Sequence, residues 1–244
     1  MSSRLEAWPL SAGDDLEPEA KDAFEQAYAE WLQPPLWDPE SFSHEQMRGL
    51  VRQVFFPGWP RSPRQVVVCP VDTGMDVASI CAEAGETLGE QLGATVCLVE
   101  ANCHCPGLER FYGRNRNDGL SAPETADAMR KSSRQVSRRV WLASWEIPLG
   151  ENGSSAVWLR NQFGELRREF DYTLLHAPPA GLFSETALLA NLADGVILVL
   201  EAHTTRRLAA RRAKETLLAA NVRLLGTVLS ERNFPIPERI YRRL

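Results

Sequence analysis

The sequence VVVCPVDTGMDVAS at residues 66–79 decides the fold class. Its first four residues form a short apolar run, as expected for a strand that is buried on both faces of a sheet. A turn containing Gly74 follows, and apolar residues then recur at helical spacing over about 75–92. The stretch therefore predicts a buried strand, a glycine-containing turn and a helix in succession.

The alternation of strand and helix continues toward the C-terminus. Buried-strand patterns lie at 95–99, 138–144, 172–175, 195–200 and 224–229. Helical patterns lie at 157–170, 184–192 and 204–220. Strands that alternate with helices are typical of right-handed crossovers in a parallel sheet. We therefore expect an α/β fold, with a mostly parallel sheet flanked by helices on both faces. The polar segment 113–136 indicates a surface segment with one short helix near Pro123.

The N-terminal side of this pattern is different. Apolar residues at helical spacing predict one helix over 17–33. A second helix is predicted over 43–56, with Ser43 as its N-cap. The sequence thus predicts two parts, an N-terminal helical extension at 1–62 and an α/β domain at 63–244.

The composition is that of an ordinary soluble globular protein. The 244 residues are 44% hydrophobic and 24% charged, with a net charge of −5, which favours partners other than nucleic acid. The five cysteines are an odd number, and residues 1–20 do not read as a signal peptide, so we expect a cytoplasmic location. The longest apolar run, 196–200, has the length of a strand. We therefore expect no direct membrane insertion, and membrane association only through a partner.

Three segments, taken in order, are similar to the nucleotide-binding motifs of a known family. They are 66–79, VCLVEAN at 96–102 and FDYTLLHAPP at 170–179. They resemble the Walker A, Walker A′ and Walker B segments of the bacterial tyrosine kinases (BY-kinases) of capsule and exopolysaccharide export, which are relatives of the MinD/ParA P-loop ATPases. Further similar segments are 45–48, 193–199 and 234–241. The resemblance extends over about 43–244 and implies a P-loop-NTPase-like fold.

The first loop lacks most of the groups that bind ATP in that family, where it reads Gly-x-Gly-Lys-Ser/Thr. There, backbone N–H groups cradle the phosphates, the lysine balances their charge and the hydroxyl binds Mg²⁺. Here Gly74 is kept, whereas Asp76, Val77 and Ala78 replace the second glycine, the lysine and the hydroxyl; Ser79 lies one position past the magnesium ligand. We expect this loop to close on itself, with Val77 turned into the fold and Asp76 capping the next helix or facing water.

The other two motifs are altered in the same direction. The family's Asp-x-Asp-Leu-Arg is EANCH at 100–104, so Glu100 and Asn102 replace the two aspartates and His104 replaces the arginine. His176 replaces the Walker B aspartate. Mg²⁺ prefers oxygen ligands, and phosphoryl transfer depends on positioning and charge neutralisation. Compared with the motifs of the family that the chain resembles, these replacements imply a chain with no catalytic residue and no cofactor. They favour a protein that is not an enzyme.

A second interpretation of the same region is a metal site. Cys103, His104 and Cys105 follow one predicted strand and His176 ends another, at the edge where open α/β sheets keep their sites. Thiolates and imidazoles are ligands for Zn²⁺. Adjacent Cys-His-Cys is not the usual chelating spacing, however, and two small thiols that fill a loop explain it as well. We therefore expect no metal, and keep these four residues as the alternative.

Charged residues on the predicted helix 43–56 indicate an interface. Glu45, Arg48 and Arg52 are similar to the Glu-x-x-Arg-x-x-Arg helix of BY-kinase rings, although Val51 takes the third position. A solvated helix face with an ordinary Glu45–Arg48 pair is the alternative. Because the acceptor edge has also lost its aspartates, we expect a monomer or a weak dimer that assembles mainly with a different protein.

Two features near the C-terminus are given structural roles. A basic helix is interpreted as a solvated outer face rather than a nucleic-acid patch. Its basic residues are Arg206, Arg207, Arg211, Arg212 and Lys214. Tyr241 stands where the family carries a cluster of tyrosines, and we expect this single tyrosine to pack against the sheet.

Taken together, the resemblance implies a catalytically inactive, BY-kinase-like pseudo-enzyme. Its expected role is that of a scaffold or regulatory binding subunit in exopolysaccharide or capsule biosynthesis or export. The expected partner is a protein, either a membrane polysaccharide co-polymerase or an active kinase relative. The alternative is an enzyme with a repurposed site, which either binds nucleotide weakly or holds a metal at the Cys103, His104, Cys105 and His176 positions.

Overall fold

The structure is a computed structural model that describes residues 39–56, 62–113, 130, 132–145 and 154–231. The chain divides into two compact units, Met1–Glu45 and Gln46–Leu244. The helix predicted over 17–33, the short helix near Pro123 and the packing of Tyr241 lie outside the described residues. The division expected at residue 62 stays a prediction.

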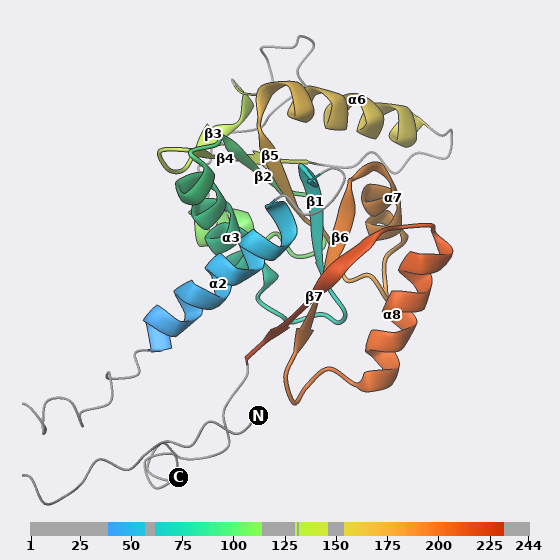
Figure 1. Ribbon diagram of the computed structural model, residues 1–244. Coiled ribbons are helices and arrows are strands. Elements are labelled where there is room, and N and C mark those ends of the chain that lie inside the picture. The colour runs from blue at the N-terminus through green and yellow to red at the C-terminus, as the bar shows by residue number, and fades with distance from the viewer. Residues whose placement is uncertain (1–38, 57–61, 114–129, 131, 146–153, 232–244) are drawn as a thin grey trace, which may run out of the picture. The chain divides into compact units, whose positions relative to one another are not determined.

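Seven strands form one sheet in the second unit (Figure 1). They are β1 (Gln65–Pro70), β2 (Val96–Glu100), β3 (Arg134–Gln135), β4 (Val140–Ser144), β5 (Tyr172–His176), β6 (Gly195–Glu201) and β7 (Leu224–Ser230). Their order is β3-β4-β2-β5-β1-β6-β7, and neighbours run parallel except for β3 and β4. The sheet is therefore mostly parallel, and the predicted fold class is confirmed.

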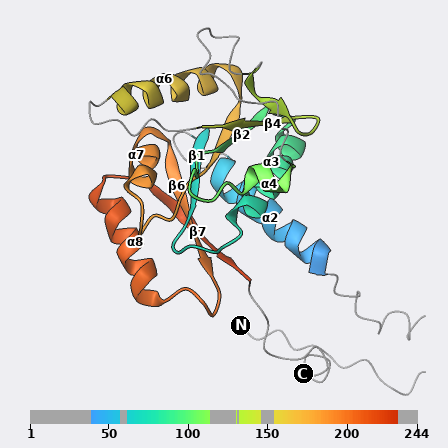
Figure 2. The ribbon, with the colours of Figure 1, turned by 180° about the vertical axis from the view of Figure 1, so that it is seen from behind.

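Helices cover both faces of this sheet (Figures 1 and 2). They are α2 (Pro39–Phe55), α3 (Val77–Leu92), α4 (Leu108–Phe111), α6 (Ser154–Glu169), α7 (Ser184–Leu192) and α8 (Arg207–Ala219). Buried side chains of α2, α3 and α4 form one apolar cluster with the sheet, and those of α6, α7 and α8 form a second. Within the described residues, no helix is both long enough and apolar enough to cross a membrane.

The two clusters explain why β1 is apolar without interruption. Side chains alternate between the two faces of a strand, so Val66 and Val68 enter one cluster while Val67 and Cys69 enter the other. All four are buried. The apolar run that opens the sequence argument is thus a strand with a core on each side, as predicted.

One local expectation needs correction, and two short elements were not expected. Helix α2 begins at Pro39 rather than at residue 43, so Ser43 lies inside the helix and is not its N-cap. Proline is well tolerated in the first turn of a helix, where its missing N–H has no partner to lose, and the apolar spacing does not reveal such a start. The sequence analysis also missed β3 and α4. Both are too short to display a periodic pattern.

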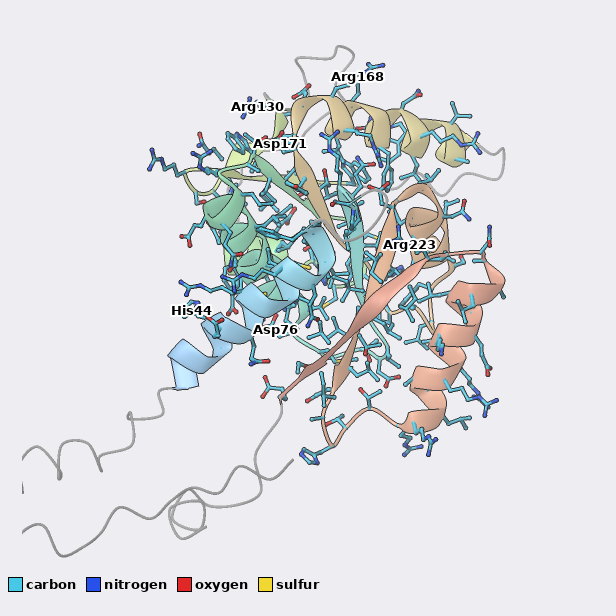
Figure 3. All side chains as sticks on the ribbon, in the orientation of Figure 1. His44, Asp76, Arg130, Arg168, Asp171 and Arg223 are labelled. Carbon is cyan, nitrogen blue, oxygen red and sulfur yellow. The ribbon has the colours of Figure 1, made fainter. Side chains whose placement is uncertain are left out.

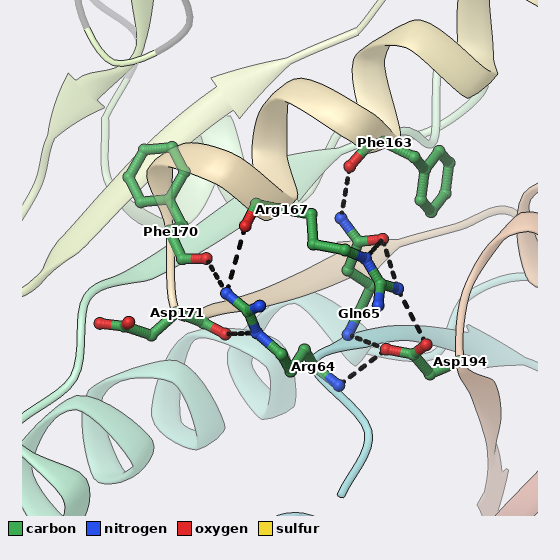
Figure 4. A network of polar contacts seen from close by, with 7 residues as sticks. All are labelled: Arg64, Gln65, Phe163, Arg167, Phe170, Asp171 and Asp194. Carbon is green, nitrogen blue, oxygen red and sulfur yellow. Dashed lines mark hydrogen bonds and ion pairs between the residues drawn. The ribbon is translucent and has the colours of Figure 1, made fainter. Parts of the chain in front are cut away.

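A polar network fixes the amino-terminal edge of the sheet (Figure 4). The Asp194 Oδ2 accepts hydrogen bonds from the backbone N–H groups of Arg64 and Gln65, at 2.8 and 2.9 Å, and the Arg167 guanidinium donates to Oδ1 at 2.8 Å. Burial alone raises the pKa of Asp194, but these three bonds outweigh it and lower the pKa. The Arg64 guanidinium in turn donates to the Phe170 carbonyl at 3.0 Å. The start of β1, the end of α6 and the start of β6 are therefore held together.

Candidate functional site

The motif residues that the sequence analysis selected follow or end β1, β2 and β5, at the carboxyl edge of the sheet. In the parallel register, Glu100 lies opposite His176, and His176 lies opposite Val68 on its other side. Open α/β sheets keep their binding sites at this edge. The Walker A′ and Walker B positions are thus direct neighbours, as the resemblance implies.

The loop after β1 closes on itself. Gly74 has a φ of +90°, which glycine adopts without strain. Asp76, which is labelled in Figure 3, is the N-cap of α3. Its Oδ1 accepts a hydrogen bond from the Ser79 backbone N–H at 3.1 Å. The side chain of Val77 is fully buried. Both local expectations for Asp76 and Val77 are confirmed. One backbone N–H group in the first turn of α3 already donates to a carboxyl oxygen of the protein itself.

Glu100 and His176 form a buried polar pair. Their exposed fractions are 3% and 4%, and the Glu100 Oε1 lies 2.8 Å from the His176 Nδ1. The same Oε1 accepts a hydrogen bond from the Asn102 N–H at 3.1 Å, and Oε2 accepts one from the Leu108 N–H at 2.8 Å. Both oxygens of this carboxyl group are therefore engaged within the protein.

Gly107 brings the chain against the remaining positions of the degenerate site. A Cβ atom added at Gly107 would lie 2.6 Å from the Ala78 Cβ and 3.3 Å from the His176 Cε1. Only glycine allows so close an approach. Ala78 and His176 are the residues that the resemblance matches to the magnesium-binding hydroxyl and the Walker B carboxylate. Protein atoms therefore pack against both positions.

The metal interpretation fails on geometry. Cys103, His104 and Cys105 are exposed, whereas His176 is buried against Glu100. The His104 ring instead stacks on Phe183, with 3.9 Å between ring centroids. Across the described part of the chain, no group of three or more His, Cys, Asp or Glu side chains could hold a metal ion. The alternative site at these four residues is therefore not formed.

The structure also places the proposed interface residues. Glu45, Arg48 and Arg52 are all exposed on α2, and a subunit interface at this helix stays a prediction. The sequence analysis missed Gly107 and Leu108, which complete the site. The available signal was Glu100 itself, since a carboxyl group that ends an apolar strand requires donors from nearby backbone.

A mostly parallel sheet with a glycine turn between β1 and α3 defines a P-loop-NTPase-like α/β protein. No family model matches the chain. Over 197 residues it is 23% identical to the tyrosine-protein kinase YwqD of Bacillus subtilis (strain 168). The aligned region covers 79% of this chain and 83% of that protein. The fold is similar to that of the chimerical protein CapA2B2, with a TM-score of 0.60, 16% identity and coverage of 81% of this chain and 87% of that chain.

A third similarity widens the group. A chain of the MinC:MinD cell division protein complex of Aquifex aeolicus matches with a TM-score of 0.54 and 17% identity, over 68% of each chain. Together with the kinase relative, this match shows that the fold is shared with proteins of different activities. The chain is therefore similar in sequence to a bacterial tyrosine kinase, and its fold is that of the P-loop proteins related to MinD.

Proposed function

We propose that this chain is a catalytically inactive BY-kinase-like protein that acts as a scaffold or regulatory binding subunit in capsule or exopolysaccharide biosynthesis. The observation that carries the proposal is the closed Glu100–His176 pair. By the resemblance, it occupies the positions of the first Walker A′ aspartate and of the Walker B aspartate, and its carboxyl oxygens already accept two backbone hydrogen bonds.

The energetics of these contacts argue against nucleotide binding. To turn toward a bound ion, Glu100 would have to release the N–H groups of Asn102 and Leu108. Each buried donor left without an acceptor costs about 1–3 kcal/mol. The lysine that would balance the phosphate charge is replaced by the buried Val77. The free energy of nucleotide binding would therefore include a cost of several kcal/mol for the broken hydrogen bonds, and no lysine at position 77 would offset the phosphate charge.

The partner is proposed from the relatives rather than from a contact in this structure. The relative named above is a tyrosine-protein kinase, and the fold is similar to that of the chimerical protein CapA2B2. We infer a cytoplasmic protein whose partner is a membrane polysaccharide co-polymerase or an active kinase relative. Co-purification of the full chain with such a protein from its own genome tests this part of the proposal.

The nucleotide part is tested by isothermal titration of the full chain with ATP, in the presence and absence of Mg²⁺. A catalytically active kinase relative titrated in parallel serves as the positive control. We expect a dissociation constant weaker than about 1 mM, equivalent to about −4 kcal/mol, and no autophosphorylation. A micromolar Mg-ATP dissociation constant, about −8 kcal/mol, contradicts the proposal. Weak binding that does not require Mg²⁺ supports the alternative of a repurposed nucleotide site.

A further inference from the structure

Helix α8 presents a cationic outer face that also exposes two leucines. The exposed basic side chains at and within this helix are Arg206, Arg207, Arg211, Arg212 and Lys214. Glu215 is the single acidic residue of the helix, and it pairs with Arg211 at 2.8 Å. Leu208 and Leu218 are 58% and 51% exposed. The face therefore combines positive charge with apolar surface.

The net charge of the whole chain conceals how charge is distributed. Residues 1–45 contain 11 acidic and two basic side chains, whereas residues 46–244 contain 25 basic and 21 acidic ones. The unit that carries α8 is therefore positive, although the chain as a whole is negative. The acidic total does not argue against an anionic partner for this unit.

The geometry of α8 fits a flat partner. Ala213 and Leu217 are fully buried and turn the opposite side of the helix outward. Figures 1 and 2, which show opposite sides, both place α8 at the outside of the second unit. Leu208 and Leu218 are ten residues apart, which is about 15 Å along a helix. A protein would need two separate pockets to receive them, whereas a fluid, flat surface receives both at once.

We propose that the outer face of α8 docks on an anionic lipid surface, lying on the bilayer without crossing it. The arginines and Lys214 attract anionic headgroups, and Leu208 and Leu218 enter the boundary between headgroups and acyl chains. Nucleic acid would satisfy the cations through its phosphates but would leave both leucines in water. The leucines therefore favour lipid over nucleic acid. This inference goes beyond the proposed function and does not depend on it. It replaces the expectation that membrane association occurs only through a partner, and it keeps the expectation that no segment inserts across the membrane.

Co-sedimentation of the full chain with vesicles tests the proposal. We expect binding to phosphatidylcholine vesicles that contain about 40% phosphatidylglycerol, little binding to pure phosphatidylcholine, and weakening as salt is raised. Each cation near an anionic surface changes the partition constant about fivefold, so Arg207→Glu with Arg212→Glu is expected to weaken binding by about a hundredfold or more. Leu208→Ser with Leu218→Ser leaves the charge unchanged and is expected to weaken it about tenfold.

Matched controls come from other surfaces of the chain. Arg138→Glu with Arg160→Glu removes the same charge from two other exposed arginines, and Leu182→Ser changes a leucine that is 61% exposed. Both controls should retain binding to within about twofold, with unchanged circular dichroism as the check on folding. Equal loss in the control arginine variant, or no effect of the leucine variant, overturns the proposal and indicates unspecific charge attraction. Tighter binding to duplex DNA than to the vesicles, independent of the leucines, also overturns it.

Discussion

Replacing Glu100 by glutamine perturbs the candidate site with almost no change of shape. In the protein, one carboxyl oxygen lies 2.8 Å from the Leu108 N, and the other lies 3.1 Å from the Asn102 N and 2.8 Å from the His176 Nδ1. Glutamine has one carbonyl oxygen and one NH₂ group. Whichever way the amide is turned, its NH₂ group faces a backbone N–H that has lost its acceptor.

The expected cost follows from that donor-to-donor contact. A buried backbone donor without an acceptor costs about 1–3 kcal/mol. Because Glu100 and the N–H groups around it are buried, water cannot replace the lost acceptor. We therefore expect Glu100→Gln to lower the free energy of unfolding by about 2–3 kcal/mol.

Equilibrium unfolding in urea, followed by circular dichroism, measures this loss. With a slope of about 2–3 kcal/mol per M, the midpoint should fall by about 1 M. Glu215→Gln is the matched control, since Glu215 is exposed on α8 and pairs only with Arg211 at the surface; we expect a change below about 0.5 kcal/mol. If Glu100→Gln were as mild as this control, the buried network would not hold the site closed and our reasoning would be refuted.

Two further predictions concern thiols and acid. The exposed Cys103 and Cys105 should react quickly with a thiol reagent in the native protein, and the other three cysteines only after unfolding. The reason is that burial raises the pKa of Cys69 to about 12 and also raises the pKa values of Cys81 and Cys97. Fast reaction of more than two thiols in the native protein would contradict this prediction. Asp194→Asn should cost about 1–2 kcal/mol at pH 7. Since the pKa of Asp194 is lowered on folding, its contribution is present above about pH 4 and lost as pH falls through the folded pKa, so urea midpoints of variant and parent should converge in acid.

The sheet could be predicted because its strands are strongly patterned. β1 and β6 are apolar runs with a core on each side, and α7 was predicted at its observed bounds, Ser184–Leu192. Starts and ends were harder to predict where capping rather than apolar spacing decides them. The start of α2 at Pro39 is one case, because proline continues no apolar pattern and yet begins a helix well.

The candidate site was predictable residue by residue but not as an arrangement. The replaced motif positions could be read from the sequence, as could the inward turn of Val77 and the cap at Asp76. The hydrogen bond from the Leu108 N–H to Glu100 could not be predicted, because it depends on a one-turn helix with no periodic signal. The stacking of His104 on Phe183 could not be predicted either, since it joins two loops that are far apart in the sequence.

The residues that differ from the family's motifs contact one another or the same neighbouring backbone, so together they form one packed arrangement. Ala78, in place of a hydroxyl, leaves room for the close approach of Gly107. That approach brings the Leu108 N–H to Glu100, and His176, in place of an aspartate, supplies the same carboxyl group with a third contact. An aspartate at position 176 would instead place two carboxyl groups side by side in a buried position, where like charges are strongly unfavourable. Each of these residues thus contacts another one of the set, so the arrangement is internally consistent and keeps the fold at this edge of the sheet.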